Sequence, residues 1–280
     1  MIQDLHGKWV LLSGAASGIG RETCRLLAKE GCNFVVIDID PVGLEHIADE
    51  LKATGSSVIS KVVDVTKKDQ IQELVAEVTA QIGTVDILVN NAGIGHNQDL
   101  RHTTDADWHK LMNINFFAVL DMTNAFLPSM IHKGGGQIVN MSTGQVFFPV
   151  PTWGAYAASK AALATYSECL TWELSCFKIR VTTVFPGLIS TPFYKDVNAT
   201  TLPQRLVLWY INSLGSTPDV MARKIVKGIK HRRRRVIQSF INWMDYYIKR
   251  ISPMAFDIGG DVFAMALCDR RKDSTSTEVF

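Results

Sequence analysis

A tyrosine and a lysine lie four residues apart in the segment GAYAASK, residues 154–160. A spacing of i, i+4 places Tyr156 and Lys160 on the same face of a helix. A phenol has a reference pKa of ~10, so it needs a shift of about three units, or roughly 4 kcal/mol, to act as a base near pH 7. A neighbouring ammonium favours the phenolate. Whether Tyr156 acts as a general acid or base depends on what else the chain provides.

A glycine-rich turn, SGAASGIG at residues 13–20, lies between a predicted strand and a predicted helix. Gly14, Gly18 and Gly20 allow a tight turn and a close backbone approach, and the helix N-terminus presents free N–H groups to a pyrophosphate. Asp38 lies 24 residues after Gly14, at the end of the next predicted strand. A carboxylate there accepts hydrogen bonds from the adenosine ribose and repels a 2′-phosphate. No Arg or Lys occupies the turn before Gly18, so the site is predicted to bind NAD rather than NADP.

These motifs lie in a chain that alternates apolar strand-like runs with amphipathic helical segments. Continuous apolar strands between helices are typical of a parallel sheet that is covered on both faces, so an α/β fold is expected. No repeat or low-complexity linker divides the chain, which predicts one domain over residues 1–255 and a partly frayed tail over 256–280. The expected strands are 8–13, 34–38, 57–63, 85–90, 136–142 and 178–187, and the expected helices are 19–30, 41–53, 67–81, 105–132 and 155–176.

The composition excludes several classes of protein. Hydrophobic residues make up 47% of the 280 residues, which allows a sizeable core, and the net charge of +2 is too small to indicate nucleic-acid binding. The five cysteines form no CxxC motif, and no Cys/His cluster has zinc-ligand spacing, so no metal is expected. Scattered thiols and the absence of a long apolar segment predict a cytoplasmic protein, with the C-terminal helix discussed below as a reservation.

Six motifs, in order, resemble those of the short-chain dehydrogenase/reductase family over residues 5–195. They are the turn SGAASGIG, with Ser13 where threonine is usual, the pair Asp64-Val65, the motif NNAG at 90–93, Asn115 in a helix, the YxxxK of Tyr156 and Lys160, and PGLIST at 186–191. The resemblance implies a cofactor site formed by Gly14, Ser17, Gly18, Ile19, Gly20, Asp38, Asp64, Val65, Asn91, Ala92, Gly93, Tyr156, Lys160, Pro186, Gly187, Ile189 and Thr191.

The resemblance also implies a fold and a reaction. The fold is a Rossmann-type, doubly wound parallel sheet of about seven strands, with VIQ at 236–238 as the last strand. The reaction is hydride transfer between a nicotinamide and an alcohol or carbonyl. Tyr156 would take the hydroxyl proton in oxidation and return it in reduction. Lys160 would also hold the nicotinamide ribose, and Asn115 would hold a water that links Lys160 to solvent.

Two hydroxyl groups are candidates for holding the substrate oxygen. The family places a serine after the fifth strand, about 13 residues before the tyrosine, and this spacing selects Thr143. Ser142 has the usual residue type but needs a loop one residue longer, which the two prolines of QVFFPVPTWG could accommodate. Either hydroxyl can donate and accept a hydrogen bond. Residue type favours Ser142, and both residues are kept as catalytic candidates.

The expected substrate end is rich in aromatic and aliphatic residues. Phe148, Trp153 and Phe193 are the expected substrate contacts, and residues 190–215 lie where relatives have a lid. No charged residue stands out as a fixed partner for a sugar, phosphate or carboxylate. We therefore expect a bulky apolar alcohol or ketone, such as a sterol, a retinoid or a long-chain fatty compound.

An amphipathic helix is predicted at residues 239–251. A run of basic residues at 230–235 precedes it, and relatives commonly form dimers or tetramers through long helices such as 155–176. The C-terminal helix either packs on its own domain, a lid or a partner subunit, or lies on a membrane surface; the first alternative is favoured. Its apolar stripe consists of Phe240, Ile241, Met244, Tyr247, Ile248 and Ile251.

Two other functions fit parts of this pattern. An NAD-dependent sugar-nucleotide epimerase or dehydratase has a related fold, but its glycine motif usually carries one more residue after the first turn. A non-catalytic NAD-binding sensor or scaffold would not need Tyr156, Lys160 and Asn115 together. The sequence therefore predicts an NAD-dependent alcohol dehydrogenase or ketone reductase that acts on a hydrophobic substrate.

Overall fold

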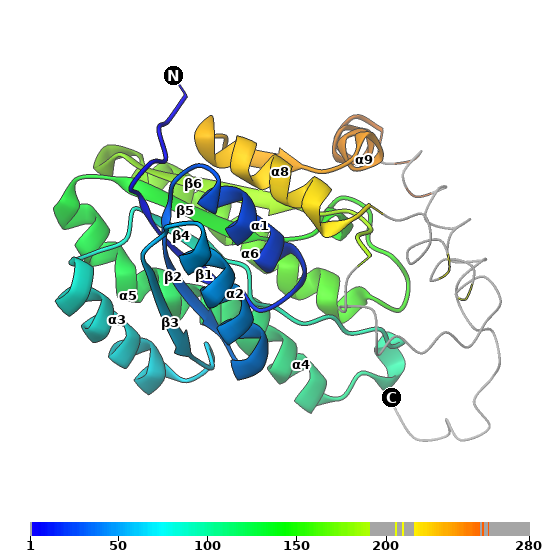
Figure 1. Cartoon of the computed structure of the whole chain (residues 1–280). Helices are drawn as coiled ribbons and strands as arrows, with labels where there is room; N and C mark the ends of the chain where they lie inside the picture. The colour runs from blue at the N-terminus through cyan, green and yellow to red at the C-terminus, as the bar shows by residue number, and fades with distance from the viewer. Residues whose placement is uncertain are drawn as a thin grey trace.

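The computed structural model describes residues 2–190, 205, 209, 216–252, 254 and 257. The strands among these residues form one sheet of seven, in the order β3-β2-β1-β4-β5-β6-β7, and every neighbouring pair is parallel (Figure 1). The predicted doubly wound, Rossmann-type sheet is therefore confirmed. The strands are β1 Trp9–Ser13, β2 Asn33–Asp38, β3 Val58–Val62, β4 Ile87–Asn90, β5 Gly136–Met141, β6 Ile179–Phe185 and β7 Arg235–Ile237.

Helices cover both faces of the sheet (Figure 1). Side chains of α1, α2 and α8 pack on one face, and those of α3, α5 and α6 pack on the other. The helices are α1 Gly18–Ala28, α2 Pro41–Ala53, α3 Lys68–Ile82, α4 Asp105–Met112, α5 Ala118–Lys133, α6 Gly154–Glu173, α8 Pro218–Lys230 and α9 Phe240–Ile251.

The core explains why the strands read as continuous apolar runs. Successive side chains of a strand point to opposite faces of the sheet. In β1, Val10 and Leu12 belong to the cluster beneath α1, α2 and α8, whereas Leu11 belongs to the cluster beneath α3, α5 and α6. Both faces are buried, so most strand residues are apolar, and the few polar ones, such as Gln137 and Asn140 in β5, are buried and hydrogen-bonded to neighbouring side chains.

Two helical regions differ from the prediction. The expected single helix at 105–132 consists of α4, a π-helical turn at Asn113–Phe117, and α5. The sequence analysis assigned no helix to α8, although its buried Met221, Ile225 and Ile229 are four residues apart. Their spacing is a sufficient signal for an amphipathic helix.

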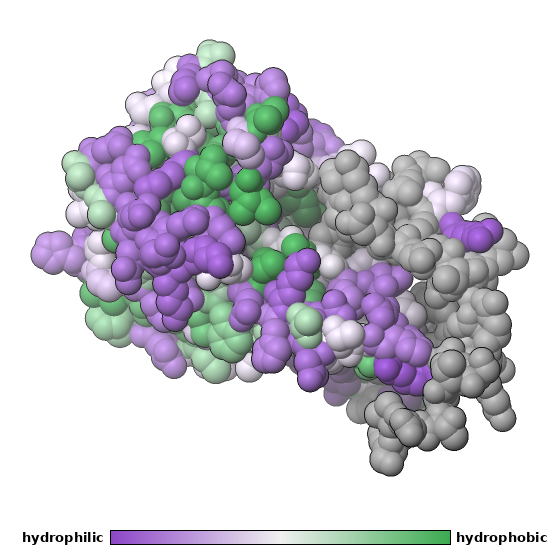
Figure 2. Space-filling model, turned by 90° about the horizontal axis from the view of Figure 1, so that it is seen from below, coloured by the Kyte–Doolittle hydropathy of each residue, from purple (hydrophilic) through white to green (hydrophobic). Residues whose placement is uncertain are grey.

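The helical region 105–133 is also long and apolar enough, by length and composition alone, to cross a membrane. Its Met122, Phe126 and Met130 are buried in the core beneath the sheet. Packing within this domain accounts for its apolar composition. Figure 2 views the molecule from below and shows hydrophobic patches between larger hydrophilic areas, as expected for a folded domain.

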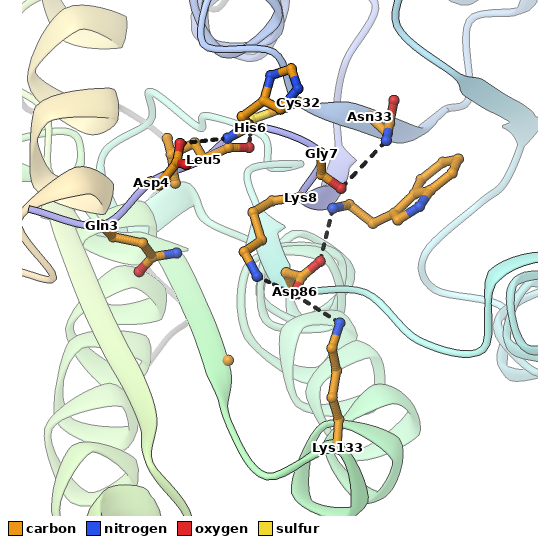
Figure 3. A network of polar contacts seen from close by, with 12 residues as sticks. Gln3, Asp4, Leu5, His6, Gly7, Lys8, Cys32, Asn33, Asp86 and Lys133 are labelled. Carbon is orange, nitrogen blue, oxygen red and sulfur yellow. Dashed lines mark hydrogen bonds and ion pairs between the residues drawn. The ribbon is translucent and has the colours of Figure 1, made fainter.

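A network of charged groups holds the sheet edge at the amino ends of β1 and β4 (Figure 3). Asp86 accepts hydrogen bonds from the N–H of Trp9 at 2.9 Å, from Lys133 Nζ at 2.8 Å and from Lys8 Nζ at 3.3 Å. Burial opposes ionisation of Asp86, but the bonds from Lys133 and Trp9 outweigh it and lower the pKa of the carboxyl. The amino edge is thus fixed by ionic contacts, and the carboxyl edge is left for a ligand.

Candidate active site

A cavity of about 470 Å³ lies at the carboxyl ends of the central strands. The loops that follow β1, β2, β4, β5 and β6 all contribute to its wall. Doubly wound sheets bind ligands at this position, where the strand order reverses. The lining includes Gly14, Ser17, Gly18, Ile19, Asp38, Asp64, Val65, Asn91, Ala92, Gly93, Ser142, Thr143, Phe148, Tyr156, Lys160, Pro186, Gly187 and Ile189.

The glycine-rich turn is held in place by the strands on either side of β1. The N–H of Gly14 donates to the carbonyl of Ile37 at 2.9 Å. The side-chain amide of Asn91, after β4, donates to the carbonyls of Ser13 and Gly14, both at 3.0 Å. The NNAG motif therefore supports the shape of the turn as well as lining the cavity.

The glycines of this turn are required by conformation and by space. Gly14 has a φ of +71° and Gly18 a φ of +53°, which L side chains rarely adopt. A Cβ on Gly20 would lie 2.0 Å from the carbonyl oxygen of Gly14. Gly20 is not among the lining residues; it lets α1 pack closely against the turn. The resulting cradle at the N-terminus of α1 fits a pyrophosphate.

The expected adenosine end also lies on this cavity. Asp38, half-buried at the end of β2, accepts a hydrogen bond from the N–H of Ala16 at 2.8 Å and another from the N–H of Asp40 at 3.1 Å. Asp64 accepts from the N–H and the hydroxyl of Thr66, at 2.9 and 2.7 Å. Asp38 therefore has a structural role in the turn in addition to the ribose role expected for it.

The YxxxK pair lies in the first two turns of α6, and both side chains are buried. Trp153 packs edge-on against Tyr156, with ring centroids 5.6 Å apart. Lys160 Nζ donates to the carbonyl of Met141 at 2.9 Å, and no carboxylate pairs with it in the described part of the chain. Burial lowers the pKa of Lys160 to about 8. Among the described residues, the buried ammonium therefore has one hydrogen-bond acceptor and no ion-pair partner.

The two candidate hydroxyl groups differ in their contacts. Ser142 is buried, and its hydroxyl donates to the carbonyl of Lys160 at 2.9 Å. Thr143 Oγ1 accepts a longer bond, 3.4 Å, from the N–H of Gln145 and caps the short helical turn at Gly144–Val146. An acceptor role leaves the hydroxyl hydrogen of Thr143 available for another group. The geometry favours Thr143 over Ser142 as a donor into the cavity.

Asn115 lies in the π-helical turn and is fully buried, so it does not line the cavity. Its side chain accepts from the N–H of Ile94 at 2.9 Å and donates to the carbonyl of Ile94 and the hydroxyl of Ser159. A Cβ on Gly93 would lie 2.9 Å from Asn115 Oδ1 and 3.1 Å from Lys160 Nζ. Asn115 and Lys160 therefore flank the same glycine. π-helical turns of this kind often mark functional sites.

The three expected substrate contacts do not lie together at the cavity. Phe148 lines the cavity, whereas Trp153 lies behind Tyr156 and is not among the lining residues. Phe193 and Thr191 lie outside the described residues, as does most of the expected lid. The sequence analysis missed several apolar lining residues, which had no motif to mark them: Ile94, Ile114, Met141, Val150 and Leu188.

The C-terminal helix α9 has its apolar side toward solvent and its polar side toward the domain, the reverse of an ordinary amphipathic helix. Its predicted stripe faces outward, and Phe240 and Ile251 are 71% and 78% exposed. Its polar side faces the domain, where Asn242 and Asp245 line the cavity. The stripe therefore does not pack on the described part of its own domain. The i, i+3 spacing of Asn242 and Asp245 was visible in the sequence, but nothing marked that face as the inner one.

A switch-point cavity that joins a glycine-rich turn to a buried Tyr–Lys pair defines a class of protein, the dinucleotide-binding oxidoreductases that act on CH–OH or keto groups. The model of the family described as "short chain dehydrogenase" matches residues 8–202. The chain belongs to the short-chain dehydrogenase family.

Two curated relatives and one solved structure illustrate the likeness. The chain is 38% identical over 188 residues to a 3-oxoacyl-[acyl-carrier-protein] reductase of Thermotoga maritima, covering 67% of this chain and 76% of that protein. It is 34% identical over 260 residues to human estradiol 17-beta-dehydrogenase 11, covering 91% and 82%. A short-chain dehydrogenase/reductase from Burkholderia phymatum, solved in complex with NAD, has the same fold, with a TM-score of 0.82, 22% identity and coverage of 97% and 100%.

Proposed function

We propose that the protein transfers a hydride between NAD and a hydrophobic alcohol or ketone, with Tyr156 as the general acid and base. One observation carries the proposal: the glycine-rich turn, Asp38 and the Tyr156–Lys160 pair line a single cavity at the carboxyl edge of the sheet. The cofactor half and the chemical half of the predicted site therefore share one cavity, which supports hydride transfer within it.

The residues suit the proton part of this reaction. When bound, the nicotinamide takes a hydride from the alcohol carbon or gives one to the carbonyl carbon. In oxidation Tyr156 removes the hydroxyl proton, and in reduction it returns a proton to the oxygen. The ammonium of Lys160, which has no carboxylate partner among the described residues, favours the phenolate, and its remaining hydrogens can donate to the nicotinamide ribose. Thr143 donates to the substrate oxygen, and Ser142 holds α6 through the carbonyl of Lys160.

The preference for NAD rests on Asp38. Its carboxylate lies at the end of β2 on the cavity wall, where the second hydroxyl of the adenosine ribose is bound in Rossmann-type sites. Both oxygens already accept backbone hydrogen bonds, which fixes the orientation of the charge. A fixed negative charge there disfavours a 2′-phosphate.

A hydrophobic substrate is supported by the wall near Tyr156. Phe148, Val150, Ile94 and Leu188 contribute apolar surface there. The human relative named above is called an estradiol dehydrogenase, and a steroid is a substrate of this chemical kind. Apolar walls with a few polar groups are typical of sites for such molecules.

Association with other molecules stays a prediction. Exposed Trp172 and Phe177, at the end of α6, support a homodimer or homotetramer, which analytical ultracentrifugation would test.

The outward stripe of α9 supports a peripheral membrane contact. Two ion pairs inside the domain argue against an electrostatic contribution to this membrane contact: Lys230 pairs with Glu30, and Arg235 pairs with Glu168. Sedimentation with vesicles, with and without phosphatidylserine, would test it; failure to pellet with either would favour a cytoplasmic protein.

The proposed reaction is tested with purified protein. Formation of reduced nicotinamide is followed with NAD and with NADP, across a panel of lipophilic primary and secondary alcohols. We expect turnover with NAD and its loss in Tyr156→Phe, which removes only the phenolic oxygen. Tight NAD binding without turnover, unchanged in Tyr156→Phe, would instead identify a non-catalytic nicotinamide-binding protein.

A further inference from the structure

We propose that Asn242 and Asp245 of α9, together with Gln145, form a subsite that binds a second oxygen group on the substrate, a hydroxyl or carbonyl close to the reacting carbon. This inference rests on the proposed function and deepens it. It assigns to α9 a role in substrate selection that neither the cofactor motifs nor the Tyr156–Lys160 pair provides.

The first turn of α9 is fixed against the loops that follow β5 and β6. Gln238 Oε1 accepts the N–H of Gly187 at 2.5 Å, and the hydroxyl of Ser239 caps the helix by accepting the N–H of Asn242 at 3.0 Å. One turn further on, Tyr246 packs edge-on against Phe147, with centroids 5.2 Å apart. These contacts set the rotation of α9 and direct its polar side to the cavity.

The amide of Asn242 lies between two glycines on the cavity wall. A Cβ on Gly144 would lie 2.2 Å from Asn242 Nδ2, and a Cβ on Gly187 would lie 3.2 Å from it. Neither glycine has a positive φ, so the space that Asn242 occupies explains why they are glycines. Asn242 Nδ2 is buried and has no hydrogen-bond partner among the described residues. An unpaired buried donor is costly, so its retention in a cavity wall indicates a ligand group that completes it.

Two acceptors accompany this donor. Gln145 Oε1 is buried, accepts no hydrogen bond from any residue that the structure describes, and belongs to a residue that lines the same cavity. Asp245 is half-buried and lines it too, with no hydrogen bond or ion pair among the described residues. Burial raises the pKa of Asp245, as expected for a carboxyl that forms no ion pair within the described part of the chain. The donor of Asn242 matches a hydroxyl or carbonyl oxygen, and the two acceptors match the hydrogen of a hydroxyl.

The position of the subsite limits where this second group lies in the substrate. The amide of Asn242 lies against Gly144, the residue that directly follows Thr143, whose hydroxyl is proposed to hold the reacting oxygen. The second oxygen is therefore a few bonds from the reacting carbon, as in a 3-oxo ester, a hydroxy ketone or a vicinal or 1,3-diol. The rest of the substrate meets apolar wall.

The test compares two ketones of equal chain length, ethyl 3-oxohexanoate and 4-nonanone, which differ in the ester oxygens. Binding is measured by calorimetry to Tyr156→Phe protein saturated with NADH, so that affinity is separated from turnover. We expect the oxo ester to bind at least tenfold more tightly than the ketone. Adding Asn242→Leu should abolish that difference, and adding Met244→Leu, on the outer side of α9, should leave it intact.

Three results would overturn the subsite. They are equal affinity for the two ketones before Asn242 is changed, no binding of either ketone, and an equal loss for both in Asn242→Leu. Weaker NADH binding in Asn242→Leu would also overturn it, because the amide would then belong to the cofactor site. Turnover of the ketones by protein with Tyr156 intact is measured separately, so failure of the proposed reaction is distinguished from failure of the subsite.

Discussion

Replacing Lys160 by methionine is expected to stabilise the fold while abolishing activity. Lys160 is 4% exposed, donates one hydrogen bond to the carbonyl of Met141 and has no carboxylate partner among the described residues. Burial alone lowers its pKa from 10.5 to about 8. A methionine fills a similar volume without a charge. The buried ammonium is thus expected to cost stability, and the reaction proposed above would account for its retention.

The magnitude follows from the pKa shift. Lowering the pKa from 10.5 to about 8 corresponds to a penalty of about 3 kcal/mol for the charged form. Loss of the bond to Met141 offsets about 1 kcal/mol of the gain. At pH 7, where the folded lysine is still largely protonated, Lys160→Met should therefore raise the free energy of unfolding by about 2 kcal/mol.

The dependence on pH gives the sharper test. Below pH 8 the lysine is protonated in both the folded and the unfolded chain, and above pH 10.5 it is neutral in both. Between these values only the unfolded chain holds the proton, so the stability of the wild-type protein rises with pH relative to the variant. From pH 7 to pH 9.5 the difference between the two proteins should fall by about 2 kcal/mol.

Urea unfolding without cofactor, at pH 7 and pH 9.5, measures these quantities. Groups common to both proteins cancel in the difference. Lys227→Met, at an exposed position of α8, is the matched control for the loss of a lysine at the surface. A Lys160→Met protein less stable than wild type at pH 7, with a difference that does not change by pH 9.5, would refute the reasoning.

Three more predictions concern the site. Asp38→Asn keeps an oxygen for the N–H of Ala16 but removes the charge, so the ratio of kcat/KM for NAD over NADP should fall at least tenfold; an unchanged ratio would exclude a role for the charge. Thr143→Ala should lower kcat about 100-fold, whereas Ser142→Ala should mainly lower the melting temperature. The opposite result would show that Ser142, and not Thr143, binds the substrate oxygen. Asn115→Leu leaves both backbone groups of Ile94 without their partner, and urea unfolding should show a loss of about 2–4 kcal/mol; equal stability would contradict the buried network.

Some parts of the site are determined by residues that are neighbours in the sequence. The Tyr156–Lys160 spacing gives a common helix face, and a glycine-rich turn between a strand and a helix gives a phosphate cradle. Asp38 could be placed because it ends a strand whose apolar run is itself recognisable. Such features depend on backbone periodicity and turn chemistry, so the sequence alone is sufficient to predict them.

Other parts depend on contacts between residues far apart in the chain. The hydroxyl of Ser142 is turned toward Lys160, 18 residues later, and this contact cannot be inferred from spacing. Trp153 supports Tyr156 from behind instead of lining the cavity, because the start of α6 turns its ring into a small core cluster.

Helix α9 shows most clearly the difference between what the sequence predicts and what distant contacts decide. Its periodicity predicted an apolar and a polar side, but periodicity cannot state which side packs inward. Gln238 bound to Gly187 and Tyr246 packed on Phe147 decide that question, and they turn Asn242 and Asp245 into the cavity. The sequence determined the helix and its two faces; only the tertiary structure decided their orientation, because it follows from contacts with strand ends more than 50 residues away.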